Sequence, residues 1–137
     1  MRYLLDTNAC IALINRKPTA LRARLDRALA RDAELFVSAV AAFELWYGVA
    51  KSAHQETNAQ RVEAFFAGPV NLLPFEEEDS RSAGKIRAAL EAVGKSIGAY
   101  DLLIAGQALR RNLTLVTANV REFKRIPGLM WENWARP

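Results

Sequence analysis

Short runs of β-type apolar residues alternate along this chain with longer segments of helical periodicity. The predicted strands are Tyr3–Leu5, Leu35–Val37, Val70–Leu73, Thr114–Val116 and, with a weaker pattern, Leu129–Trp131. The segments between them read as helices, with apolar residues recurring at helical spacing. This alternation predicts a three-layer α/β domain with a mainly parallel sheet of about five strands flanked by helices. The length of 137 residues fits one domain spanning residues 1–137.

Polar side chains follow the predicted strands where each strand ends. Asp6 comes directly after the first strand, and Ser38 follows the second. Thr117 and Asn119 follow the fourth. The carboxyl ends of parallel strands meet at one edge of a sheet, which is where ligands bind in such folds. Asp6 is equally compatible with a plain helix cap, since Asp is preferred at that position.

Two further carboxylates lie in predicted helices. Glu44 stands in the apolar segment AAFELWY, and burying a lone Glu is costly unless it is paired or binds a cation. The alternative is a surface position with a salt bridge to an arginine. Asp101 opens the most apolar helical segment, residues 100–111. A simple helix cap is the alternative there.

The composition excludes several kinds of chemistry. One histidine, His54, and one cysteine, Cys10, can form neither an internal disulfide nor a Cys/His zinc site. The single cysteine fits a reducing compartment, so we expect a cytoplasmic protein. The longest uncharged run, residues 64–75, is too short to span a membrane, so we expect no membrane partner. Catalysis by this chain would therefore rest on carboxylates.

Carboxylates gathered at one sheet edge repel one another unless a cation neutralises them. Hard oxygen ligands of this kind suit Mg²⁺ or Mn²⁺. Such a metal can polarise a phosphoryl oxygen and activate water for attack. The formal net charge of +4 is a weak indication of a polyanionic partner. Together these features predict metal-dependent hydrolysis of a nucleic acid.

Two charged stretches have simpler interpretations. The densest basic stretch comprises Arg16, Lys17, Arg22, Arg24, Arg27 and Arg31, relieved only by Asp26. It suits an RNA backbone or an acidic partner segment, but an ordinary solvated helix face is the stronger alternative. The acidic run Glu76–Asp79 precedes a predicted helix and favours its positive N-terminal end. We assign this run no role in the site.

Four sequence blocks in a fixed order are typical of one family. They are Leu4-Leu5-Asp6-Thr7-Asn8, Ser38 with Glu44-Leu45 and Gly48, Asp101-Leu102-Leu103-Ile104-Ala105, and Leu115-Val116-Thr117-Ala118-Asn119 with Phe123. The segments Ile126-Pro127-Gly128-Leu129 and Glu132-Asn133-Trp134 follow the same pattern. Through its whole length the chain resembles a PIN-domain ribonuclease, specifically a VapC-type toxin of a type II toxin–antitoxin system.

The resemblance implies a PIN-like fold, a Mg²⁺- or Mn²⁺-dependent endoribonuclease activity on RNA, a cognate antitoxin partner and usually a homodimer. It assigns Asp6, Glu44 and Asp101 to the metal and to catalysis. The family's fourth acidic position is Asn119 here, so either Asn119 acts through water or Glu122 supplies the missing charge. The expected reaction is attack of a metal-bound water on the phosphodiester, a route that needs no histidine.

Two other classes of function compete with this prediction. A PIN-fold binding module that pairs with an antitoxin or RNA without cleavage is favoured only by Asn119. A phosphoacceptor signalling domain would need a pair of adjacent acids early in the chain, and Asp6 has no such neighbour. An endoribonuclease toxin is therefore the leading prediction.

Overall fold

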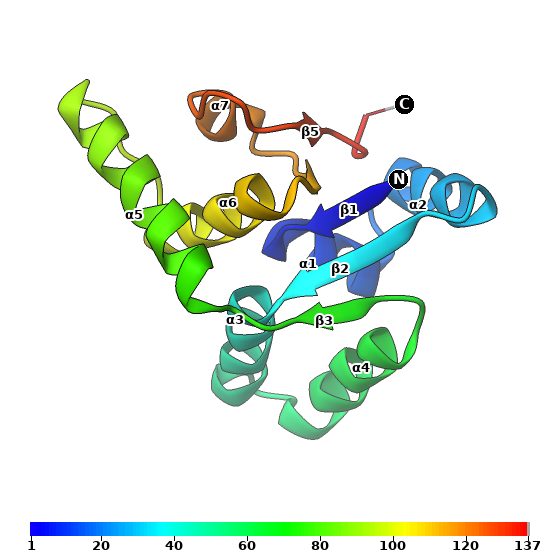
Figure 1. Cartoon of the computed structure of the whole chain (residues 1–137). Coiled ribbons are helices and arrows are strands. Elements are labelled where there is room, and N and C mark those ends of the chain that lie inside the picture. The colour runs from blue at the N-terminus through cyan, green and yellow to red at the C-terminus, as the bar shows by residue number, and fades with distance from the viewer. Residues whose placement is uncertain (137) are drawn as a thin grey trace.

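A computed structural model describes residues 1–136 and contains a five-stranded parallel sheet flanked by helices (Figure 1). The strand order is β3-β2-β1-β4-β5, which confirms the predicted architecture. The strands are β1 (Arg2–Leu5), β2 (Glu34–Ser38), β3 (Asn71–Leu73), β4 (Thr114–Val116) and β5 (Trp131–Glu132). The helices are α1 (Thr7–Asn15), α2 (Thr19–Ala30), α3 (Ala39–Lys51), α4 (Gln55–Ala67), α5 (Glu77–Ala92), α6 (Ala99–Arg111) and α7 (Val120–Phe123).

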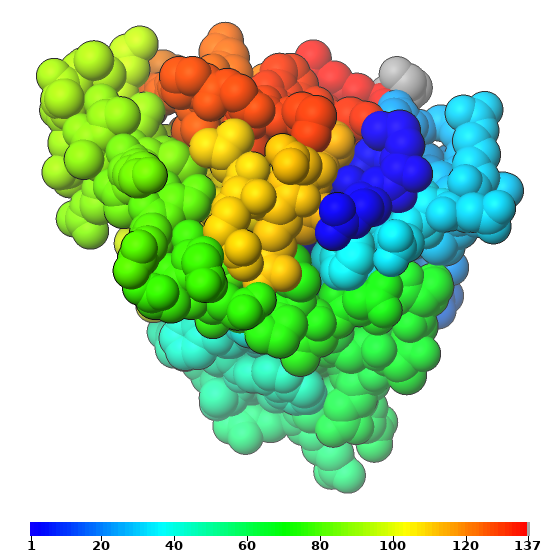
Figure 2. All heavy atoms as spheres, in the orientation of Figure 1, coloured from blue at the N-terminus to red at the C-terminus, as the bar shows by residue number. Residues whose placement is uncertain are grey.

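The path of the chain distributes the helices over the sheet. The connections from β1 to β2 and from β2 to β3 advance toward one edge, whereas the connection from β3 to β4 returns past β1. Because parallel crossovers are right-handed, α1 to α4 cover one face and α5 and α6 cover the other. Figure 1 shows α5 and α6 side by side, and Figure 2 shows the far end of α5 projecting from the body.

The register of the central strands aligns their carboxyl ends. Leu5 of β1 pairs with Val37 of β2 on one side and with Val116 of β4 on the other. The next residues along the three segments are therefore Asp6, Ser38 and Thr117, with exposed fractions of 2%, 0% and 1%. Three polar side chains thus follow buried strand residues in matched positions at this edge of the central sheet.

Some predicted boundaries differ from the structure. The fifth strand begins at Trp131 rather than Leu129, because the Leu129 N–H bonds to the Ile126 carbonyl in a turn. The acidic run does not precede its helix as expected, since α5 begins at Glu77. Three of the four acids therefore lie in the first helical turn. Within residues 1–136, no helix is both long and apolar enough to cross a membrane.

The α5–α6 contact depends on one glycine. A Cβ atom added to Gly106 of α6 would lie 2.7 Å from backbone and side-chain atoms of Ala83 in α5. We therefore expect Gly106→Ala to destabilise the protein by about 1–3 kcal/mol, despite the better helix propensity of alanine. Urea unfolding followed by circular dichroism would measure the change.

Gly84 of α5 provides the matched control for this substitution. It is exposed, and a Cβ atom there would meet nothing within 4 Å. Gly84→Ala should therefore stabilise the protein by up to about 1 kcal/mol, through helix propensity alone. Equal effects of the two substitutions would show that the close approach of α5 to α6 is not what constrains residue 106.

Candidate active site

Asp6 lies at the carboxyl end of β1 and is anchored on two sides. Its backbone N–H donates to the Val116 carbonyl at 3.1 Å, which ties the end of β1 to the end of β4. Its Oδ1 accepts the Ala9 N–H at 2.7 Å, so Asp6 also caps α1. The two interpretations of Asp6 are thus compatible, because capping occupies one oxygen of a carboxylate that stands at the sheet edge.

Burial raises the pKa of Asp6 above its ordinary value, and the nearby Glu44 carboxylate raises it further. Hydrogen bonds with the Thr117 side chain and the Ala9 N–H act in the opposite direction and stabilise the ionised form. Asp6 is therefore a desolvated carboxylate that the surrounding fold partly supports as an anion.

Glu44 reaches the same edge from α3. It is half-buried, and its Oε1 accepts a hydrogen bond of 2.6 Å from the hydroxyl of Thr7. Thr7 follows Asp6 and begins α1, so this bond links the first and third helices beside the end of β1. The alternative of a salt bridge between Glu44 and an arginine is wrong for the described residues 1–136, where Thr7 is the side-chain partner.

Asp101 lies in the first turn of α6, near enough to Asp6, Glu44 and Glu122 for their charges to act on it. The N-cap of α6 is Gly98, so the capping interpretation of Asp101 is wrong. The pKa of Asp101 is raised from 3.8 to about 6, first by burial and then by the negative charges of Asp6, Glu44 and Glu122. This electrostatic coupling brings together the three carboxylates predicted from the sequence.

Asn119 and Glu122 form a hydrogen-bonded pair whose negative charge acts on Asp101. Asn119 precedes α7, and its N–H donates to the Thr117 hydroxyl at 2.9 Å. Its side-chain amide donates to Oε2 of Glu122 at 3.1 Å. Asn119 thus orients a carboxylate whose charge reaches Asp101. The two candidates for the fourth acidic position, Asn119 and Glu122, are therefore joined by a hydrogen bond.

The carboxylates of the site lack cationic partners in the described part of the chain. Among residues 1–136, no salt bridge involves Asp6, Glu44, Asp101 or Glu122. Within the same residues, no three His, Cys, Asp or Glu side chains are grouped closely enough to hold a metal ion. The arrangement is thus a cluster of mutually repelling acids whose side chains, in these rotamers, do not converge on one point.

The cysteine and the histidine of the chain are not placed to react at this acidic cluster. Cys10 is fully buried in α1, and burial raises the pKa of its thiol well above the ordinary value. A thiol in that setting stays protonated and unreactive. His54 is exposed in the short connection between α3 and α4. Carboxylates are therefore the groups at this edge that can take part in acid–base chemistry or bind a cation.

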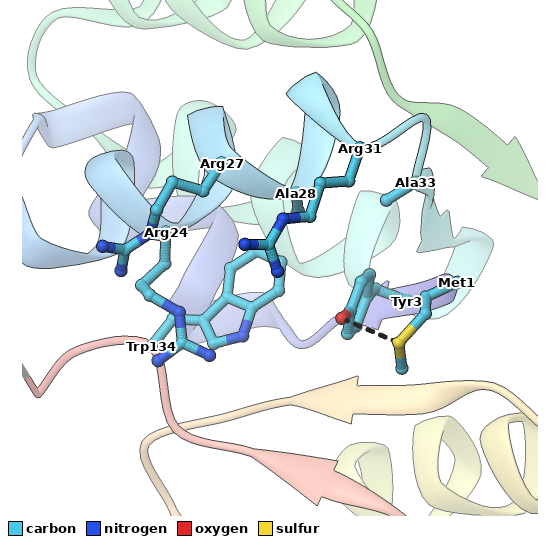
Figure 3. A pocket seen from close by; sticks show the side chains of 8 residues that line it. All are labelled: Met1, Tyr3, Arg24, Arg27, Ala28, Arg31, Ala33 and Trp134. Carbon is cyan, nitrogen blue, oxygen red and sulfur yellow. Dashed lines mark hydrogen bonds between the residues drawn. The ribbon is translucent and has the colours of Figure 1, made fainter.

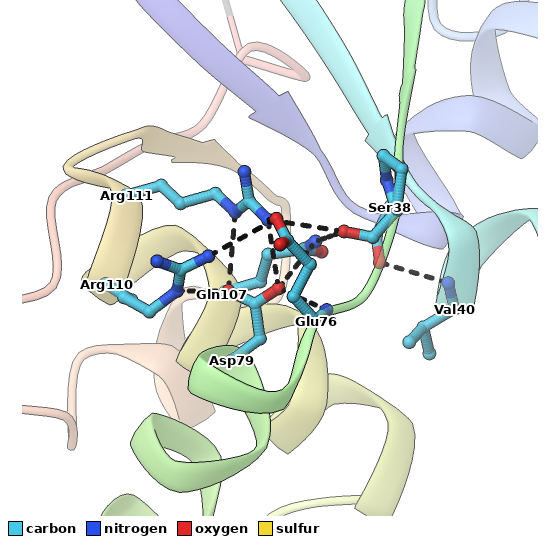
Figure 4. A network of polar contacts seen from close by, with 8 residues as sticks. Ser38, Val40, Glu76, Asp79, Gln107, Arg110 and Arg111 are labelled. Atoms are coloured by element: carbon cyan, nitrogen blue, oxygen red, sulfur yellow. Dashed lines mark hydrogen bonds and ion pairs between the residues drawn. The ribbon is translucent and has the colours of Figure 1, made fainter.

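A second polar network, which sequence reasoning missed, centres on Asp79 (Figure 4). Asp79 is 0% exposed, although the acidic run was assigned no role beyond the end of its helix. Its Oδ1 accepts from Nε of Arg110 at 2.7 Å, and its Oδ2 accepts from the Glu76 N–H at 2.8 Å and from Arg111 at 3.2 Å.

The role of the Asp79 network is structural. Burial by itself would raise the pKa of Asp79, but hydrogen bonds from Arg111, Glu76 and Arg110 outweigh it and lower the pKa. These contacts join the start of α5 to the end of α6. Because α6 carries Asp101 at its other end, the network holds the helix that positions Asp101. The only sequence signal was the pairing of an acidic run with adjacent arginines 31 and 32 residues later.

Comparisons with known proteins agree with this geometry. A family model described as the PIN domain matches residues 3–129. The chain is 40% identical over 134 residues to Ribonuclease VapC2 of Rickettsia felis, covering 98% of each chain. It is 39% identical over 134 residues to the tRNA(fMet)-specific endonuclease VapC of Salmonella typhimurium, again covering 98% of each.

Solved structures with the same fold include complexes. The structure of VapBC2 from Rickettsia felis, bound to a promoter DNA fragment, aligns with a TM-score of 0.91 and 39% identity, covering 98% of this chain and 99% of that one. VapBC-5 from Mycobacterium tuberculosis, a member of the VapBC family of toxin-antitoxin systems, aligns with a TM-score of 0.68 and 26% identity, covering 96% and 95%.

Proposed function

The chain belongs to the PIN-domain family and groups with its VapC ribonucleases, and we propose that it is a divalent-metal-dependent endoribonuclease, the toxin of a toxin–antitoxin pair. The observation that carries the proposal is the electrostatic coupling of Asp101 to Asp6, Glu44 and Glu122. Four acids without cationic partners in residues 1–136 are unfavourable by themselves. They become favourable when they hold a cation.

The chemistry of the donor set fits Mg²⁺ or Mn²⁺. Both ions prefer carboxylate oxygens, and Asp6, Glu44 and Asp101 offer these at one edge of the sheet. In residues 1–136 these side chains are not grouped closely enough to hold an ion as they stand, so side-chain rotations would accompany binding. Such an ion, when bound, would polarise the scissile phosphate and lower the pKa of a bound water.

The protein's own groups would keep the donors ionised and oriented. The Ala9 N–H and the Thr117 hydroxyl stabilise the anionic form of Asp6, while the Thr7 hydroxyl fixes one oxygen of Glu44. Asn119 donates a hydrogen bond to Glu122, whose charge acts on Asp101. These hydrogen bonds act as the outer support that metal-binding carboxylates require.

We also propose a protein antitoxin as the partner of the chain. The VapBC structures that share its fold belong to complexes of that system. Exposed aromatic residues support a protein contact beside the carboxylates. Phe43 next to Glu44 packs edge-on against Tyr100 next to Asp101, with ring centroids 5.5 Å apart. Both rings are about half exposed, and apolar surface of this kind marks interaction sites.

The decisive experiment measures RNA cleavage by the purified chain in the presence of Mg²⁺, Mn²⁺ or EDTA. An initiator tRNA transcript is a suitable probe because the Salmonella relative is a tRNA(fMet)-specific endonuclease. We expect cleavage with either ion and its loss, by at least about 100-fold, with EDTA or in Asp6→Asn. Circular dichroism would check that the variant folds.

Restoring the metal is the control for this experiment. Adding excess Mn²⁺ after EDTA should restore cleavage by the parent chain and leave Asp6→Asn inactive. Cleavage that resists EDTA, or full activity in the variant, would contradict the proposed mechanism. RNA or antitoxin binding without cleavage under every condition would favour the alternative, a PIN-fold binding module.

A further inference from the structure

A cavity of about 390 Å³ opens beside α2, away from the carboxylates (Figure 3). It is lined by Met1, Tyr3, Arg24, Arg27, Ala28, Arg31, Ala33 and Trp134, and we call it the α2 pocket. Its lining contains three arginines and no acidic residue. The pocket lies beside the start of β1, whereas Asp6 follows the end of that strand. Tyr3 and Asp6 are therefore separated by roughly 10 Å along an extended backbone.

The three arginines form a regular row. They occupy positions i, i+3 and i+7 of the helical segment around α2, and in Figure 3 their side chains leave the same side of the helix. At 1.5 Å per residue the row extends over roughly 10 Å. A stacked nucleic acid strand places one phosphate about every 3.4 Å along its axis, so the row is long enough to span a few consecutive phosphates.

One arginine of the pocket, Arg24, forms an ion pair with Glu132, whereas the other two arginines remain available to bind an anion. Arg24 donates to Oε1 of Glu132 at 3.2 Å, and the same oxygen accepts the indole N–H of Trp134 at 2.9 Å. These bonds fix the buried Trp134 ring as the floor of the cavity. In residues 1–136, neither Arg27 nor Arg31 makes a salt bridge or a side-chain hydrogen bond, and both are exposed.

The negative charge of the active site makes a separate basic surface necessary for RNA binding. Asp6, Glu44, Asp101 and Glu122 repel the phosphate backbone, and one divalent ion offsets only part of their charge. Affinity for RNA must therefore come from cations outside the carboxylate cluster. Arginine is suited to this role because its planar fork matches phosphate oxygens and stays charged at every physiological pH.

We infer that the α2 pocket is a second RNA-binding site, which holds phosphates of the substrate backbone away from the cleavage point. The inference rests on the proposed function, since it assumes that RNA is the substrate. An acidic protein segment is the competing occupant. The regular spacing of the arginines and the polyanionic substrate of a nuclease both favour RNA, whose charges recur at a fixed interval.

The test compares Arg27→Ala/Arg31→Ala with Lys85→Ala/Lys95→Ala, which removes the same charge. Both lysines are exposed on or after α5, on the side of the molecule opposite α2 in Figure 1. Binding of the initiator tRNA transcript is measured between about 0.05 and 0.3 M salt, without divalent metal and in an Asp101→Asn background that slows cleavage. A polyglutamate peptide serves as the probe for an acidic protein segment.

The arginine pair should bind the transcript roughly 10- to 30-fold more weakly at about 0.15 M salt, and the slope of log K against log salt should fall by about 1.4–1.8. Each lost phosphate contact lowers the slope of log K against log salt by about 0.7–0.9, and two contacts are lost. The lysine pair should change neither quantity by that amount. With Asp101 intact, the arginine pair should raise KM and leave kcat within about twofold, the pattern of lost binding outside the reacting centre.

Three results would overturn the inference while leaving the proposed function standing. They are unchanged binding by the arginine pair, an equal loss in the lysine pair, and a loss of polyglutamate binding with RNA binding intact. Failure of the parent chain to bind or cleave the transcript is a separate result, measured first, and it would remove the proposed function together with this site.

Discussion

Replacement of Asp101 by asparagine is expected to reduce RNA cleavage by about 10²- to 10⁴-fold while the fold stays intact. Asparagine keeps the size of the side chain but removes one of four coupled negative charges. The variant should therefore hold a divalent ion poorly and orient it wrongly. Initial rates of cleavage at saturating Mn²⁺, for parent and variant at equal concentration, measure the effect.

The same variant should gain stability at neutral pH. The pKa of Asp101 is raised from 3.8 to about 6, so the folded protein holds its proton more tightly than the unfolded chain does. The corresponding stability is fully present below about pH 3.8 and is lost as the pH rises through about 6. The Tm of Asp101→Asn should thus exceed that of the parent above about pH 6, and the gap should close under acid conditions.

Metal addition supplies a readout that does not depend on cleavage. Mn²⁺ should raise the Tm of the parent at neutral pH, because a ligand that binds only the folded state stabilises it. The variant should respond much less. A variant that cleaves RNA normally, or a Tm gap that does not change with pH, would contradict the assignment of Asp101 to a coupled acidic site.

Asp79→Ala is expected to cost about 3 kcal/mol of folding free energy, the second large effect. Asp79 is fully buried and accepts hydrogen bonds from two arginines, a backbone N–H and the amide of Gln107. Its removal leaves Arg110 and Arg111 without their buried partner at the α5–α6 junction. The expected value lies at the low end for broken buried pairs, because both arginines keep some contact with water.

Glu77→Ala is the matched control for Asp79→Ala. Glu77 lies in the same helical turn but pairs with Arg81 at the surface, where both side chains are more than half exposed. Such i,i+4 pairs contribute about 0.3–0.5 kcal/mol. Urea unfolding of both variants gives the comparison. Similar losses in the two proteins would show that burial of Asp79 does not set the strength of its network.

The pH dependence of Asp79 has the opposite sign to that of Asp101. The pKa of Asp79 is lowered from 3.8, so its stabilising effect is present above that pH and is lost as the pH falls through the folded value. Acid unfolding of the parent below about pH 4 should therefore be less marked in Asp79→Ala, whose contribution is already missing.

Much of the site could be predicted because its signals are local. Asp6 directly follows a strand pattern, and Ser38 and Thr117 do the same on the neighbouring strands. The rule that ligands bind beyond the carboxyl ends of parallel strands then places them at one edge. Glu44 was indicated as a lone acid in an apolar helical segment and Asp101 as the acid that opens the most apolar helix; in the structure the charges of Asp6 and Glu44 act on Asp101.

Three questions needed the structure, because side-chain conformation and tertiary packing decide them. Asp101 was compatible with a helix cap in the sequence, but the structure has Gly98 at the N-cap of α6 and Asp101 in its first turn. Asn119 and Glu122 were alternatives for one position, and the structure joins them by a hydrogen bond. Asp79 read as a solvated helix end because nothing near it in the sequence indicated that two arginines of α6 would cover it.

Local sequence patterns were enough to predict the order of strands and helices, the parallel sheet and the positions where acids follow strands. Periodicity and turn residues act over a few neighbouring positions, and for that reason these features can be predicted from the sequence alone. Which acids interact with one another and which are paired with arginines depends on how the helices and strands pack together. Thr7 reaches Glu44 across 37 residues and Arg111 reaches Asp79 across 32. Contacts of that range, and the burial that shifts a pKa, exist only when the elements pack against one another.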